Sequence, residues 1–122
     1  MRLTLTTFTL STSDPDGLAD FYAALLGWEV RRREPDWVVL RSPDDRLALA
    51  CQLEPQHVRP VWPGGPGDQQ MQAHLEIQVD DLEEAGAYAR SLGAELAEHQ
   101  PQDDVRVLYD PAGHPFCLWI ES

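Results

Sequence analysis

The stretch AHLEIQVDDLEEAGAYARSLGAEL, residues 73–96, contains a strand, a helix and a glycine stop in that order. Its first seven residues alternate between apolar and polar side chains, which is typical of a strand with one buried face. Asp81 stands where a helix N-cap is expected, and Gly93 follows the last apolar position of the helix. The stretch therefore predicts a strand and a helix that ends near residue 93.

An earlier part of the chain repeats this order. Residues 4–13, TLTTFTLSTS, are rich in threonine and alternate as a strand does. Asp14 is then the expected N-cap of a helix, with Pro15 at its first position and Gly27 after its end. The apolar residues of this helix recur at the spacing of one face, and they are Leu18, Phe21, Tyr22 and Leu25. The chain therefore contains two similar modules, each of which begins with a strand and a helix.

Three further strands are expected after each helix, separated by turn-forming residues. In the first module they are residues 28–34, 37–42 and 46–53, and in the second they are residues 94–99, 104–110 and 115–121. Residues 54–72 carry four prolines and three glycines, which predicts a linker without regular structure. The sequence thus predicts one domain over residues 1–122, with modules at 3–53 and 73–122.

The two modules can be aligned by their buried faces. With Thr7 opposite His74, the apolar residues of both first strands point toward their own helices. The alternate positions then carry Thr7, Thr9 and Ser11 in the first module, and they carry His74, Glu76 and Gln78 in the second. The histidine therefore has a threonine as its counterpart.

Composition limits the partners and the location of the protein. The chain has 21 acidic against 9 basic residues and a net charge of −12, which disfavours nucleic acid and anionic membranes and favours cationic partners. The basic run at residues 30–34 is expected on the exposed side of a strand. No apolar run approaches a membrane span and no signal peptide is evident, so we expect a cytoplasmic protein with Cys51 and Cys117 as thiols.

The motifs SDPDGLADFYAALLGWEV, HLEIQVDDLEEAGAYARSLGAEL and DPAGHPFCLWIE resemble the vicinal oxygen chelate superfamily, which includes glyoxalase I, bleomycin-resistance proteins and extradiol dioxygenases. The resemblance covers essentially the whole chain. It implies an α+β fold in which two tandem βαβββ modules form an open, cup-like, eight-stranded mixed sheet with the helices outside. It also implies a ligand site inside the cup and a homodimer.

Alternation identifies the residues expected on the inner face of this cup. The predicted ligand-binding set is Thr7, Thr9, Gln52, Trp62, His74, Gln78, Cys117 and Trp119, where Trp62 belongs to the linker and the fourth-strand position is open between Ala50 and Gln52. Candidate catalytic residues are His74 with Glu76 or Glu121, because a carboxylate beside aromatic rings can act as a base. His74 as a hydrogen-bonding residue in a polar lining is the alternative.

The resemblance implies four metal-ligand positions, at Thr7, a fourth-strand residue, His74 and Cys117. Only His74 has a strong ligand type, and a buried Cys117 thiol should have a raised pKa. We therefore expect no resident metal or other cofactor, and a divalent metal rescued by Glu76 or Glu121 is the alternative.

Function follows from these expectations. The leading hypothesis is a metal-independent small-molecule-binding protein of the glyoxalase/bleomycin-resistance type, which would sequester a cationic or aromatic compound in the cup. The alternative is a glyoxalase-like lyase or isomerase that uses His74 with Glu76 or Glu121, with or without a divalent metal. An interaction domain with an unused cup is a third class.

Overall fold

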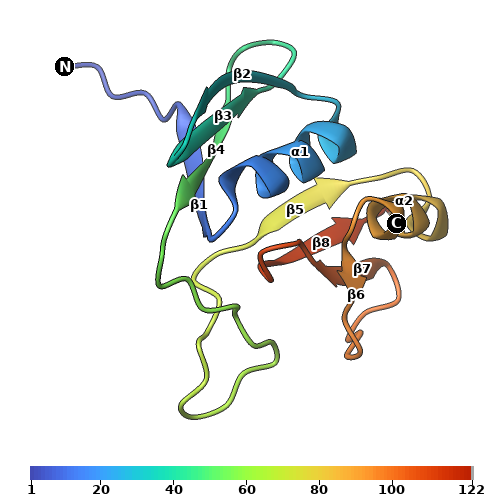
Figure 1. Ribbon diagram of the computed structural model, residues 1–122. Coiled ribbons are helices and arrows are strands. Elements are labelled where there is room, and N and C mark those ends of the chain that lie inside the picture. Colours follow the sequence, from blue (N-terminus) through green and yellow to red (C-terminus); the bar gives the residue numbers. More distant parts are fainter. Residues whose placement is uncertain (122) are drawn as a thin grey trace. The chain divides into compact units, whose positions relative to one another are not determined.

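The computed structural model describes residues 1–121, and within them the order β-α-β-β-β occurs twice (Figure 1). The chain divides into two compact units, Met1–His57 and Val58–Ser122. Ser122, the last residue of the predicted second module, lies outside the described residues. The duplicated topology confirms the predicted α+β fold class, and its strands form two four-stranded mixed sheets.

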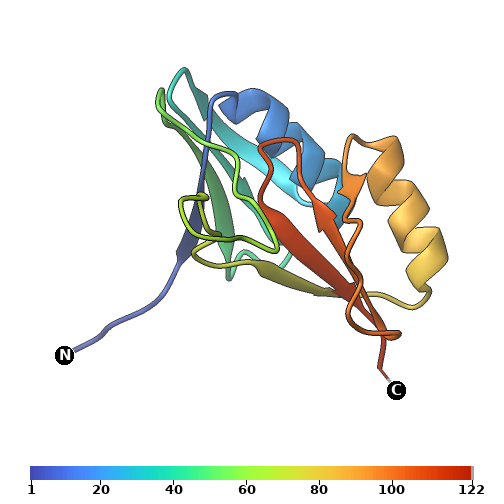
Figure 2. The same cartoon turned by 90° about the horizontal axis from the view of Figure 1, so that it is seen from below.

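The first unit contains a four-stranded sheet and one helix. Its elements are β1 (Thr7–Thr12), α1 (Pro15–Leu26), β2 (Glu29–Glu34), β3 (Trp37–Arg41) and β4 (Ala48–Leu53). The strand order is β1-β4-β3-β2, with β1 parallel to β4 and the other pairs antiparallel. Helix α1 contacts all four strands and covers one face of the sheet (Figure 2).

Helix α1 begins and ends where the sequence predicts. The Asp14 carboxylate accepts a hydrogen bond from the Gly17 amide at 3.0 Å, which satisfies one of the open donors of the first turn. Gly27 ends the helix at φ 69°, a left-handed conformation that glycine adopts without a steric cost. The predicted apolar stripe is buried at Leu18, Phe21 and Tyr22, so this face of the helix forms the core of the first unit.

The basic run of β2 is neutralised within the first unit. Arg33 donates to both Asp16 and Asp20 of α1 at 2.6 Å, and these two bonds, with Asp20 first, raise the pKa of its guanidinium. Arg31 pairs with Glu29 and Asp45, and Arg32 pairs with Glu34. These arginines are exposed, as predicted, and their charges face acidic side chains.

The second unit repeats the same arrangement on a shorter sheet. Its elements are β5 (Leu75–Gln78), α2 (Leu82–Ser91), β6 (Glu95–Leu96), β7 (Val105–Tyr109) and β8 (Pro115–Trp119). The strand order is β5-β8-β7-β6, and β5 is parallel to β8. Helix α2 contacts β6, β7 and β8, and Asp81 caps it by accepting from the Glu84 amide at 3.0 Å.

The strand predicted over residues 94–99 is much shorter in the structure, since β6 contains two residues. A glutamine side chain explains the difference. Gln100 donates from Nε2 to the carbonyls of Ala97 and Val107, at 2.8 and 2.9 Å, and its Oε1 accepts from the Val107 amide at 2.9 Å. The hydrogen bonds of the Gln100 side-chain amide thus take the place of those that the backbone of a longer edge strand would make.

The linker forms neither helix nor strand, as predicted, but it is fastened to the second unit. Arg59 donates to the Pro111 carbonyl at 2.8 Å, and the Tyr109 hydroxyl donates to the Trp62 carbonyl at 2.5 Å. Within the loop, the Val61 amide donates to the Gln69 carbonyl at 2.8 Å. These bonds hold Trp62 next to β7.

No helix among residues 1–121 is long and apolar enough to cross a membrane.

Candidate functional site

The face of the second sheet turned away from α2 carries the residue types that the sequence singles out. The parallel register places Glu76 beside Cys117 and Gln78 beside Trp119. Paired residues of neighbouring strands point to the same face, so these four side chains share it, while Phe116 and Leu118 are buried on the other. The face predicted for this part of the chain is therefore confirmed.

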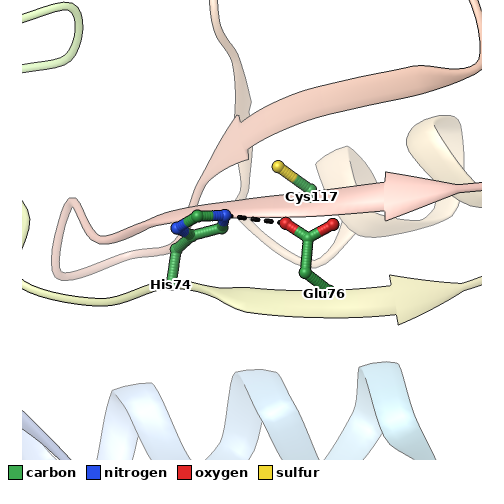
Figure 3. Close-up of side chains that lie close together, drawn as sticks. All are labelled: His74, Glu76 and Cys117. Carbon is green, nitrogen blue, oxygen red and sulfur yellow. Dashed lines mark ion pairs between the residues drawn. The ribbon is translucent and has the colours of Figure 1, made fainter.

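His74, Glu76 and Cys117 form a compact cluster on this face. His74 Nε2 lies 2.7 Å from Glu76 Oε2, and the side chains point toward one another, with Glu76 on the edge strand β5 and His74 just before its first residue (Figure 3). The Cys117 thiol comes from the neighbouring strand, and one ligand-type atom of each residue lies within 4.8 Å of the other two. The cluster thus brings together an imidazole, a carboxylate and a thiol.

The Cys117 thiol is protonated at neutral pH. Burial raises its pKa to about 12, and the hydrogen bond with Glu76 and the negative charge of that carboxylate act in the same direction. The raised pKa confirms the prediction made from its place in an apolar strand. The thiol is therefore a weak hydrogen-bond donor toward Glu76 and a poor nucleophile.

A pocket of about 210 Å³ opens over the cluster, and we call it the sheet pocket. Its polar lining consists of His74, Glu76, Gln102 and Cys117. Its apolar lining consists of Trp62, Met71, Pro101, Val105, Val107 and Pro115. A mostly apolar wall with a few convergent polar groups is typical of a small-molecule site.

The structure brings only some of the predicted site residues to this pocket. His74, Glu76, Cys117 and Trp62 line it. Gln78 and Trp119 lie one step further along the same face, and Glu121 follows the end of β8. The carboxylate that reaches His74 is that of Glu76.

Three predicted ligand-binding residues belong to the first unit. Thr9 pairs with Ala50, and Gln52 pairs with Ser11 of β1 and Trp37 of β3. Thr7, Thr9 and Gln52 share the face turned away from α1, where alternation predicts them.

The prediction omitted much of the apolar wall. Val105 and Val107 lie on β7 next to Trp119 and Cys117, and the alternation of VRVLY already places them on that face. Met71, Pro101 and Gln102 come from loops, where no periodic pattern exists to reveal them.

Some members of the superfamily are metal enzymes, and the cluster carries donor groups of the types that bind metal ions. Imidazole, carboxylate and thiolate all bind zinc, and three protein ligands are usual for a catalytic zinc ion. A zinc ion here would be held by His74, Glu76 and Cys117, and it would act as a Lewis acid. The thiol would have to lose its proton despite a pKa of about 12, and the His74–Glu76 pair would have to open. The three residues are of types that bind zinc, but the protonated thiol and the closed His74–Glu76 pair oppose tight binding.

The duplicated βαβββ fold and a family match together place the chain in the vicinal oxygen chelate superfamily. Residues 7–119 match the family model described as a glyoxalase-like domain, so the chain belongs to the glyoxalase-like domain family. Among curated proteins, none matches the sequence significantly.

Solved structures show the same fold at low sequence identity. A glyoxalase/bleomycin resistance protein/dioxygenase family enzyme from Burkholderia phytofirmans PsJN is 16% identical with a TM-score of 0.71, covering 97% of this chain and 98% of its own. TnmS3, an antibiotic binding protein from Streptomyces sp. CB03234, is 18% identical with a TM-score of 0.65, covering 100% and 99%. Lactoylglutathione lyase from Agrobacterium tumefaciens is 16% identical with a TM-score of 0.63, covering 98% and 94%. Such identities show a shared fold, on which binding and catalysis both occur.

Proposed function

We propose that this protein binds a small molecule in the sheet pocket and does so without a tightly bound metal. The observation that carries the proposal is the His74–Glu76 pair at 2.7 Å beside a protonated thiol, set in a pocket whose other lining residues are apolar except for Gln102. The pair offers hydrogen bonds and negative charge, and the walls offer contact area. This combination suits recognition of a compact ligand.

The lining indicates the chemistry of that ligand. A volume of about 210 Å³ is below the usual range of drug-sized sites, so the pocket suits a small compound or one ring of a larger one. Trp62 provides a flat apolar surface, and Glu76 attracts positive charge in a chain whose net charge is −12. A cationic or aromatic compound is therefore the expected ligand. The antibiotic binding protein with the same fold provides a precedent for sequestration.

Native mass spectrometry of the purified protein tests this proposal directly. We expect a retained small molecule in the unmodified protein and its loss in Gln102→Trp, because an indole at this exposed rim position would fill the pocket mouth. Glu83→Trp is the matched control, since Glu83 is exposed on α2 and that helix covers the other face of the sheet. Retention of the same ligand by Gln102→Trp would exclude the sheet pocket as its site.

Metal independence requires its own measurement. We expect protein purified without chelator or added metal to contain far less than one divalent ion per chain, because a thiol with a pKa of about 12 and a closed His–Glu pair resist coordination. Stoichiometric zinc, nickel or iron that disappears in His74→Ala or Cys117→Ser would contradict this part of the proposal. Loss in Glu121→Ala would assign the missing ligand to Glu121.

A second candidate function is a lyase or isomerase reaction, favoured by the same 2.7 Å contact. A carboxylate that orients an imidazole can support proton transfer at a carbon next to a carbonyl group. Lactoylglutathione lyase shows that the fold can carry a lyase activity. Deuterium exchange into small α-hydroxy ketones, followed by NMR, should occur with the unmodified protein and be lost in both His74→Ala and Glu76→Gln if this candidate is correct.

We also propose a homodimer in the cytoplasm. Both sheets are open, with β1 and β2 at the edges of the first and β5 and β6 at the edges of the second, and edge strands favour pairing with another copy. Cys51 and Cys117 are thiols and not a disulfide, which is consistent with a reducing compartment. A monomer in light scattering at about 50 µM, a concentration that populates a dimer of micromolar Kd, would count against the dimer.

A further inference from the structure

A second hollow in the second unit, about 510 Å³ in volume, is lined by Trp62, Pro63, Glu98, His99 and Tyr109, and we call it the aromatic recess. We infer that the aromatic recess binds a small methylated ammonium cation such as a trimethylammonium group. This inference goes beyond the proposed function, because the aromatic recess shares only Trp62 with the sheet pocket.

Three aromatic rings form most of this lining. The Trp62 indole and the His99 imidazole lie with centroids 5.5 Å apart and planes tilted by 42°. Tyr109, from β7, adds a phenol ring. Indole and phenol faces carry negative electrostatic potential and attract a cation that lies within about 6 Å of the ring centre. Several such rings around one hollow are the usual recognition device for quaternary ammonium groups.

The loop that carries Trp62 and the Tyr109 phenol are held together before any ligand binds. The Tyr109 hydroxyl donates to the Trp62 carbonyl at 2.5 Å, which joins the loop to β7 at the recess itself. Arg59 fixes the same loop to the Pro111 carbonyl at 2.8 Å. A preformed site loses less conformational entropy on binding, so even a small ligand gains measurable affinity.

Charge selects a cation over an anion or a neutral molecule. Glu98 is the one acidic side chain among the five lining residues, and no lysine or arginine joins it. Glu95 contributes a further negative charge: burial first and the Glu95 carboxylate second raise the pKa of Tyr109, which keeps the phenol neutral. A ligand in the aromatic recess therefore meets negative potential from the aromatic rings and from the carboxylates of Glu98 and Glu95.

The lining also favours a methylated ammonium over a primary one. The Tyr109 hydroxyl already donates to the Trp62 carbonyl, and Glu98 is the only carboxylate of the lining. A primary ammonium needs three acceptors to replace its hydration, whereas a trimethylammonium group needs none and presents methyl groups to the rings.

Choline and 3,3-dimethylbutan-1-ol provide the test, because they have the same shape and differ in charge. Both are titrated into the full chain at constant ionic strength, and binding is followed by NMR at the Trp62 indole and the His99 and Tyr109 rings. We expect saturable shifts with choline and an affinity at least about tenfold weaker for the neutral isostere. Trp62→Leu should abolish the shifts, and Glu98→Gln should weaken choline binding severalfold, whereas Glu83→Gln on α2 should leave it unchanged.

Equal affinities for choline and its isostere would overturn the inference, as would the absence of choline-dependent shifts at these three rings. Choline shifts confined to His74, Glu76 and Cys117 would also overturn it, and they would instead support the sheet pocket as the cation site. Failure of the two proposals is thus distinguishable.

Discussion

The two units share one topology but differ in the side chains on the sheet face away from their helices. In the first unit, β1 and β4 carry Thr7, Thr9, Ala50 and Gln52 on this face, and none of these four is a strong acid, base or metal ligand, whereas the charged residues of the face, among them Arg41, lie on β2 and β3. In the second unit the matching face carries an imidazole, a carboxylate and a thiol within 4.8 Å. Two units with the same fold therefore need not carry the same chemistry. The repeated apolar pattern determines the sheet face that packs against the helix, whereas the residues of the opposite face differ between the units.

The largest difference between the units is expected in how much stability a substitution removes at the turn before the last strand of each unit. In the second unit, the buried Asp110 carboxylate accepts from the amides of Ala112 and His114, at 2.9 and 3.0 Å. Asp110→Ala should lower the free energy of unfolding by about 2–4 kcal/mol, because one buried and one half-buried amide lose this acceptor. Urea denaturation measures this loss.

The matching turn of the first unit provides the control. Asp44 accepts from Ser42 Oγ at 2.7 Å, but Asp44 is exposed and water can replace it. Asp44→Ala should therefore have a clearly smaller effect than Asp110→Ala. Equal losses would show that the two turns stabilise their units in the same way.

The next effect concerns the edge strand that differs between the sheets. Strand β2 has six residues, whereas β6 has two and relies on the Gln100 side chain. Gln100→Ala should cost about 1–3 kcal/mol and increase hydrogen exchange at the Val107 amide, which loses its acceptor. Gln102→Ala, at an exposed neighbouring position, should change stability by less than about 0.5 kcal/mol. Unchanged exchange at Val107 would remove the proposed role of Gln100.

Helix caps should show the two units to be equivalent. Asp14 and Asp81 each accept from a first-turn amide at 3.0 Å. Asp14→Ala and Asp81→Ala should each cost about 1 kcal/mol, and replacement by Asn should restore most of the stability. A loss confined to one helix would contradict the symmetry of the two caps.

The smallest effect near neutral pH comes from the Cys117 thiol. Because its pKa is raised from 9.0 to about 12 in the folded state, the fold holds the proton more tightly than the unfolded chain does. Stability from this group is therefore constant below about pH 9 and falls as the pH rises toward about 12. Iodoacetamide should modify Cys117 very slowly at pH 8.

Glu76→Gln sharpens this prediction. The substitution removes the negative charge of Glu76 and leaves a neutral acceptor for the thiol, and it also leaves burial, which is the largest cause of the raised pKa, so alkylation of Cys117 should accelerate only in part. Cys51, which is fully buried on β4, should stay unmodified and serves as the internal control. An alkylation rate that Glu76→Gln does not change would contradict the contact between carboxylate and thiol.

Local rules predicted much of this molecule, and tertiary contacts explain what they missed. Asp14, Asp81 and Gly27 are recognisable because caps depend on a few neighbouring residues. The face that carries His74 is recognisable because side chains alternate along a strand. The short β6 was missed because Gln100 replaces backbone hydrogen bonds with those of a side chain, which no periodic pattern reveals.

The strand-borne part of the candidate site and one loop residue were predictable. Glu76 and Cys117 follow from strand register, and Trp62 was predicted from its place in the linker, although its hydrogen bond with Tyr109, 47 residues further along the chain, was not. Its neighbours Met71 and Gln102 also come from loops. Loop positions depend on such distant bonds, so Met71 and Gln102 line the pocket without a periodic signal in the sequence.

We infer that the second unit alone carries the binding chemistry, and chemical-shift mapping of the protein without added metal checks this inference. Amide and side-chain spectra are recorded during titration with a set of cationic, aromatic and neutral fragments. We expect saturable shifts at His74, Glu76, Cys117 and Trp62, with none at Thr7, Thr9 or Gln52. Shifts at the first-unit residues without shifts at His74 and Cys117 would contradict it.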